Sequence, residues 1–134
     1  MNRRLARIRA VQALYQVEMT DVDWRHALEA ALDEGEHTDD YLADVIPGTL
    51  GELATIDEQI VNQLENWTLE RVGNVDRAVM RLAVYEMQHR EDIPVHVALN
   101  EAINTAKAFG GDEAGKFVNG VLSAKMNSSN GGGT

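Results

Sequence analysis

Apolar residues recur along most of the chain with the 3.6-residue period of amphipathic helices, and no segment shows the sustained apolar–polar alternation of a strand. One wide apolar face predicts a first helix from Arg3 to Glu18. A short second helix is predicted to begin at Trp24, after the capping-type residues TDVD, and to end near Gly35. We therefore expect an all-α protein.

The middle of the chain predicts two further helices. The first of them covers residues 41–53 and contains Pro47 and Gly48, so a bent helix and two short helices both fit. The next runs from Ile56 to Trp67, with apolar residues at helical spacing. The polar segment VGNV then interrupts the pattern.

The last third of the chain predicts three more helices, about seven in all. VDRAVMRLAVYEM is apolar on nearly every side, which is typical of a central helix packed from several directions. A sixth helix follows Ile93-Pro94 and stops at Gly110-Gly111, and Asp112 can cap a seventh. We expect two small bundles that share the central helix in one domain, residues 1–127, followed by a disordered tail, residues 128–134.

Composition restricts the class of protein. At 134 residues and 44% hydrophobic, the chain suits a single compact domain. It has no cysteine and no apolar run near the roughly 20 residues of a membrane span, so we expect a cytoplasmic protein. The formal net charge of −10 disfavours nonspecific binding of nucleic acid by the whole surface, so contact with a polyanion requires a local basic patch or a cationic partner.

Catalytic and metal-binding patterns are missing from the sequence. The four histidines show neither i, i+4 pairing nor HExxH spacing, and the acidic pairs lie where helices begin, so capping explains them. We expect no cofactor and no enzymatic activity, and the sequence favours a binding function.

The first helix begins with arginines, although cations near a helix N-terminus are mildly destabilising. Arg3, Arg4 and Arg7 lie on faces that become apolar further along, which predicts a basic arm able to contact phosphates or stack on bases. Arg9, Gln12 and Gln16 form a second stripe that could read base edges in single-stranded RNA. The alternative to RNA binding is that these basic residues are only solvated and have no binding role.

Four blocks in order, RLARIRAVQALYQVE, WTLERVGNVDRAVMRLAVYEM, IPVHVALNEAINTAKAFG and KFVNGVL, closely resemble the NusB family of bacterial transcription antitermination factors. The resemblance covers nearly the whole chain. It implies an all-helical fold of two three-helix bundles without enzymatic activity. It further implies binding to the boxA element of ribosomal RNA leader transcripts, together with NusE, a small-subunit ribosomal protein, in antitermination complexes on RNA polymerase.

Where its motifs match those of the family, the resemblance assigns binding roles to residues of this chain. The residues that resemble its RNA-binding surface are Arg3, Arg4, Arg7, Gln12, Tyr15, Lys116 and Phe117. Glu70 and Asp76 resemble the region that faces NusE, and Glu113, one helical turn before Phe117, is assigned to partner binding as well.

Two other readings keep the fold and change the role. In the first, the chain is related to the NusB-like domain that forms the N-terminal RNA-recognition module of certain ribosomal RNA methyltransferases. In the second, it is a helical adaptor that binds only proteins, and the arginines have no binding role. The free protein is expected either as a monomer or as a homodimer that hides its RNA face.

Overall fold

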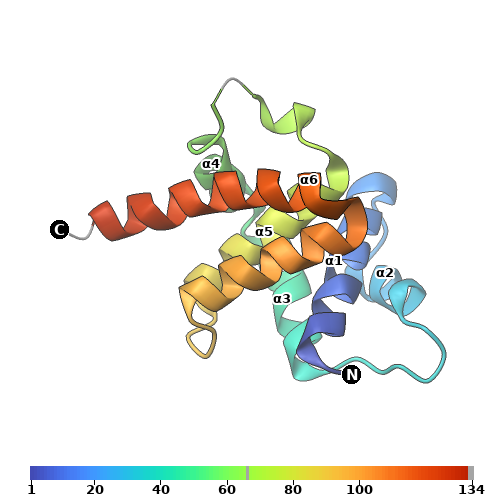
Figure 1. Ribbon diagram of the computed structural model, residues 1–134. Helices are drawn as coiled ribbons and strands as arrows, with labels where there is room; N and C mark the ends of the chain where they lie inside the picture. The colour runs from blue at the N-terminus through green and yellow to red at the C-terminus, as the bar shows by residue number, and fades with distance from the viewer. Residues whose placement is uncertain (66, 133–134) are drawn as a thin grey trace.

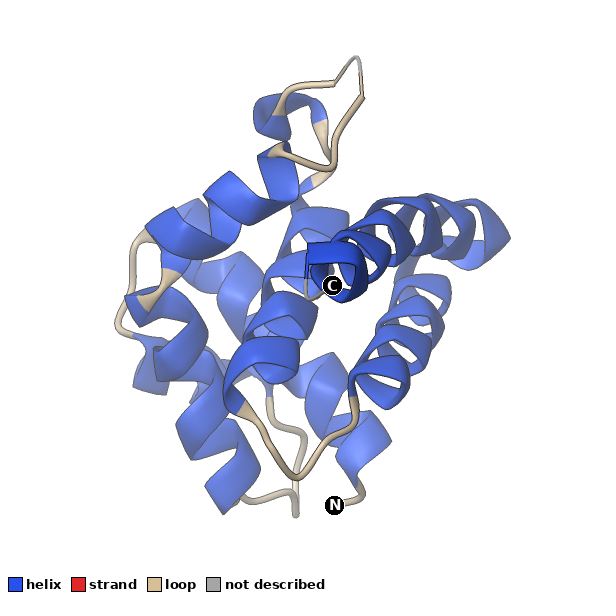
Figure 2. Cartoon of the chain, turned by 90° about the vertical axis from the view of Figure 1, so that its left-hand side faces the viewer, coloured by secondary structure: helices blue, strands red, loops and turns tan. Residues whose placement is uncertain are grey.

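The structure is a computed structural model that describes residues 1–65 and 67–132, with side chains described as far as residue 124. Within these residues the regular secondary structure is entirely helical, which confirms the predicted all-α fold (Figures 1 and 2). The elements are α1 (Arg3–Thr20), α2 (Trp24–Ala31), α3 (Asp40–Gly51), α4 (Leu53–Val61), the 3₁₀ helix η1 (Leu69–Arg71), α5 (Asn74–His89) and α6 (Val95–Gly132).

The last element contains two helical segments. Gly111 has φ 75° and ψ −167°, a conformation that interrupts α6 and that glycine adopts most easily. The two halves of α6 fold back on each other at this residue (Figure 1). In the described part of the chain, six α-helical elements therefore contain seven helical segments, in agreement with the predicted helices on either side of Gly110-Gly111. The disorder expected for residues 128–134 stays a prediction: α6 is assigned to Gly132, and residues 133–134 lie outside the described part.

Helix ends are where the predictions and the structure differ. The second helix ends at Ala31 because the backbone of Leu32 is extended. The fourth ends at Val61, where Leu64 N–H donates to the carbonyl oxygen of Val61 in a tight turn, so the predicted extension to Trp67 is wrong. Trp67 is 53% exposed. Of the two alternatives at Pro47, the structure has one helix and not two short ones, since α3 continues through Pro47 to Gly51.

The central position expected for the fifth helix is confirmed. α5 packs against α1, α3, α4 and α6, and nine of its sixteen residues are buried. α3 reaches α5 closely at Gly48, where an added Cβ would lie 2.3 Å from Cζ of Tyr85. The helix arrangement thus depends on a continuous interior around α5.

No helix of the described residues is long and apolar enough to cross a membrane.

Substituting Leu82→Ala tests this interior. Leu82 lies on α5 and is 3% exposed, so the truncation should lower the free energy of unfolding by roughly 2–5 kcal/mol through lost contacts and a residual cavity. Urea unfolding followed by circular dichroism measures the loss. Val61→Ala, at a position that is 46% exposed, is the control and should change stability little. A loss for Leu82→Ala as small as that of the control would contradict the central role of α5.

Candidate nucleic-acid interface

The first turn of α1 presents Arg3 and Arg4 to solvent. The side chain of Asn2 caps the helix by accepting a hydrogen bond from Leu5 N–H at 2.8 Å, and the first turn contains no acidic residue. Arg4 is 65% exposed at the side chain and donates to Glu101 of α6 at 3.1 Å and 3.3 Å. Both arginines therefore lie where the basic arm was predicted.

Arg7 differs from this prediction, because it lies in the interior and is 5% exposed. Its Nε and Nη2 donate to the Glu86 carboxylate on α5, the shortest distance being 2.8 Å. Burial acts to lower the pKa of Arg7, but the hydrogen bonds and charge of Glu86 outweigh it and raise that pKa. The guanidinium is thus committed to an internal ion pair, and the surface arm consists of Arg3 and Arg4.

Glu86 also binds a tyrosine from the third helix. The Tyr41 hydroxyl donates to Glu86 Oε2 at 2.8 Å, so one carboxylate connects α1, α3 and α5. Arg7 Nη1 lies 3.6 Å from Glu101, the residue that pairs with Arg4. Sequence reasoning missed both Glu86 and Tyr41. The i, i+3, i+7 spacing of Val79, Leu82 and Glu86 was a signal that the glutamate shares the apolar face of its helix.

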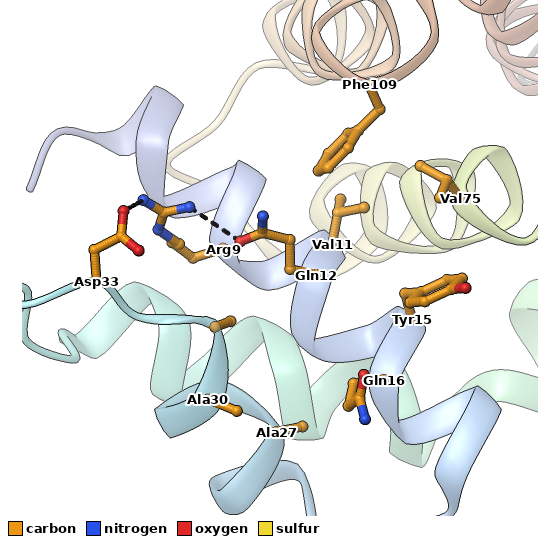
Figure 3. Close-up of a pocket in the computed structure, with 11 residues that line it drawn as sticks. Arg9, Val11, Gln12, Tyr15, Gln16, Ala27, Ala30, Asp33, Val75 and Phe109 are labelled. Atoms are coloured by element: carbon orange, nitrogen blue, oxygen red, sulfur yellow. Dashed lines mark hydrogen bonds and ion pairs between the residues drawn. The ribbon is translucent and has the colours of Figure 1, made fainter.

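A groove of about 480 Å³ lies beside α1, C-terminal to the arm along the helix (Figure 3). Gln12, Tyr15 and Gln16 line it from α1, and Phe109 points into it from α6. Aromatic and amide side chains are the groups that stack on unpaired bases and read their edges. The structure therefore places the predicted Gln12 and Tyr15 together in one concave surface, and it adds Phe109, which the sequence analysis did not single out.

Arg9 is held at the edge of this groove by carboxylates. It donates to Glu36 Oε1 at 2.8 Å and to Asp33 Oδ2 at 2.7 Å, and to Gln12 at 3.1 Å. The hydrogen bond with Arg9 lowers the pKa of Glu36. The predicted stripe of Arg9, Gln12 and Gln16 thus has its amides in the groove and its cation paired with the loop that follows α2.

The second part of the predicted RNA surface lies on the half of α6 beyond Gly111. Phe117 is half-buried and packs against the core, whereas Lys116 and Glu113 are exposed and 3.9 Å apart. In Figure 1 the first turn of α1 lies near the label N at the bottom of the view, and the half of α6 beyond Gly111 runs across the view above it. The arm and Lys116 therefore lie on different helices, α1 and α6.

Two of the predicted partner-binding acids, Glu70 and Asp76, lie close together in the chain but differ in exposure. Glu70 is exposed on η1, whereas Asp76 is half-buried in the first turn of α5, where burial raises its pKa. Glu113 is on α6, beside Lys116. Among the residues that the structure describes, no group of three or more histidine, cysteine, aspartate or glutamate side chains is arranged to hold a metal ion.

The buried ion pair predicts a stability effect. Arg7→Met should cost about 3–5 kcal/mol of unfolding free energy, because it leaves the Glu86 carboxylate buried without its cation. Chemical denaturation of the purified variant measures it. Arg4→Met, which removes an exposed arginine from the same helix, is the matched control and should cost under about 1 kcal/mol. Equal losses in the two variants would refute the assignment of Arg7 to the interior.

Comparisons with known proteins agree with this arrangement of helices. The NusB family model matches residues 4–127. The "Transcription antitermination protein NusB" of Halalkalibacterium halodurans is 50% identical over 126 residues, 94% of this chain and 94% of that relative. The structure of NusB from T. maritima has a TM-score of 0.82 at 39% identity, covering 95% of this chain and 92% of the other. A structure titled antitermination factors NusB and NusE in complex with dsRNA has a TM-score of 0.83 at 25% identity, covering 94% and 96%.

Proposed function

The chain belongs to the NusB family of transcription antitermination proteins, and from this membership we propose that it binds the boxA element of ribosomal RNA leader transcripts together with NusE. The complex would act on RNA polymerase in the cytoplasm. The similar solved structure, a complex of NusB, NusE and RNA, supports RNA and NusE as partners. The observation that carries the RNA-binding role is that α1 presents both the exposed pair Arg3 and Arg4 and, further along, a groove lined by amide and aromatic side chains.

The proposed action is binding and not catalysis. The matched family is one of regulatory proteins, and its curated relative is named for antitermination. The methyltransferase-module alternative is less well supported, because the match covers 94% of a relative that is itself an antitermination protein. A purely protein-binding adaptor would give no reason for arginines at a helix N-terminus, where they lower stability.

RNA is proposed to follow the arm and the groove on α1. Arg3 and Arg4 would contact phosphates, and Gln12 and Tyr15 would contact bases. Lys116 and Phe117 are proposed to contact a further part of the RNA, since they lie on α6 beyond Gly111 and not on α1. The acidic surface elsewhere, with a net charge of −10, would keep RNA on this track by repelling its phosphates.

NusE is proposed to bind the surface that contains Glu70 and Asp76, with Glu113 as a further contact. Exposed carboxylates complement a basic ribosomal protein, and they repel RNA. Charge would therefore direct the two partners to separate surfaces. A homodimer that hides the RNA face stays a prediction about the free protein.

Charge reversal of the arm tests RNA binding. Arg3→Glu/Arg4→Glu should remove most of the affinity for labelled boxA RNA, and the slope of log affinity against log salt should become shallower by about 1.4, or about 0.7 for each lost phosphate contact. Arg7 is left intact because its loss would disturb folding. Single reversals are compared with Arg25→Glu, an equal change of charge at an exposed arginine on α2. If Arg3→Glu and Arg4→Glu bind RNA as well as Arg25→Glu does, the arm is not the RNA site.

A second pair of titrations tests the surface assigned to NusE. Glu70→Lys/Asp76→Asn should weaken NusE binding and leave RNA binding by the lone protein unchanged or slightly stronger, since negative charge is removed. Asparagine is used at position 76 because it has nearly the size of aspartate and so preserves the packing of this half-buried position in the first turn of α5. The control, Glu29→Lys/Glu34→Gln, removes the same charge from exposed positions elsewhere. Unchanged NusE affinity, or a collapse of RNA affinity, would show that the two surfaces are wrongly assigned.

A further inference from the structure

We propose that Tyr41 is a positioning residue for RNA binding, whose ring holds the guanidinium of Arg3 at the protein surface where a phosphate would meet it. The inference rests on the proposed RNA-binding function and extends it to a residue on a different helix. Tyr41 belongs to α3 and is 3% exposed, so it would act through Arg3 and not by touching RNA.

Three guanidinium groups surround the Tyr41 ring. The Cζ atom of Arg3 lies 4.3 Å from the ring centroid, that of Arg90 5.5 Å and that of Arg7 5.7 Å. These distances are within the range of cation–π attraction, and the Arg3 contact is the shortest. One aromatic ring from α3 therefore contacts the exposed start of α1.

The three arginines differ in how their charges are compensated. Arg7 pairs with Glu86, and Arg90 pairs with Asp44 and Asp92. Arg3 forms no ion pair with a carboxylate within the part of the chain that the structure describes. The tyrosine ring is thus the contact that holds the Arg3 side chain, while its charge stays available to an anion.

This contact is compatible with phosphate binding. A guanidinium held through its flat face keeps its N–H donors in the plane of the group, where they can form a fork with phosphate oxygens. A side chain that is already ordered loses less freedom when RNA binds. The ring would therefore increase affinity without contributing a donor of its own.

Tyr41 is itself held firmly. Its hydroxyl donates to the buried Glu86 at 2.8 Å, and that carboxylate is bound by Arg7. Burial, followed by the negative charge of Glu86, raises the pKa of Tyr41, so the hydroxyl keeps its proton and stays a donor. The ring is consequently fixed beneath the first turn of α1.

A double-mutant cycle tests the proposal with labelled boxA RNA and the full chain. Tyr41→Phe keeps the ring and should bind RNA within about twofold of the unaltered protein, whereas Tyr41→Leu should bind about threefold more weakly, the size expected of a partly exposed cation–π contact. In the Arg3→Ala background the same leucine substitution should have no further effect. A role in folding alone would give equal losses in both backgrounds, and that result would overturn the proposal.

Fluorinated phenylalanines at position 41 supply a second test that preserves the shape of the interior. Each added fluorine weakens the negative face of the ring, so RNA affinity should fall stepwise when Arg3 is present and stay constant in Arg3→Ala. A flat series with Arg3 present would overturn the positioning role while RNA binding by the unaltered protein persists. Absence of RNA binding by the unaltered protein would instead overturn the proposed function, and the positioning role with it.

Discussion

The buried ion pair between Arg7 and Glu86 is the interaction on which the rest of this structure depends. Both side chains are nearly fully removed from water, so each charge is tolerable only because the other is present. The hydroxyl of Tyr41 adds a third partner, and the three residues come from α1, α5 and α3. A slip of α1 or α5 would leave a buried charge uncompensated, and a slip of α3 would remove a hydrogen bond from the buried carboxylate. The ion pair therefore fixes the relative positions of these helices in the interior, whereas their other polar contacts, such as Arg81 with Glu18 and Tyr85 with Asp44, are nearer the surface.

This constraint also determines what the beginning of α1 can do. Because Arg7 is anchored inside, the preceding turn with Arg3 and Arg4 is held at the edge of the core and not left as a loose end. The following turns bring Gln12 and Tyr15 to the groove beside Phe109. A single helix therefore carries a structural arginine, two exposed arginines and a concave surface in a fixed order.

Much of the fold could be predicted because helix periodicity and helix-ending residues are local signals. The break at Gly111 follows from its positive φ, a conformation that glycine tolerates and other residues resist. Periodicity could not decide between a bent helix and two short helices at Pro47, because that choice depends on tertiary packing, and it could not show the early end of α4 before Trp67, which depends on turn geometry. The exposure of Arg3 and Arg4 could be anticipated in the same way. The burial of Arg7 could not, because it depends on Glu86 from a helix far away in the sequence.

The arginines of α1 form a gradation in how readily a phosphate could replace their present partners. The surface pairs of Arg4 with Glu101 and of Arg9 with Asp33 are partly solvated, and such pairs contribute about 0–1 kcal/mol each. An RNA phosphate could displace those carboxylates with little loss of stability. Arg7 cannot be exchanged in this way, because the freed Glu86 would stay buried. Arg3, which lies over the Tyr41 ring, pairs with no carboxylate among the residues that the structure describes. The burial of the partner therefore decides whether an arginine of α1 serves folding or can bind RNA. This explains how an acidic protein can keep a basic helix start available to RNA.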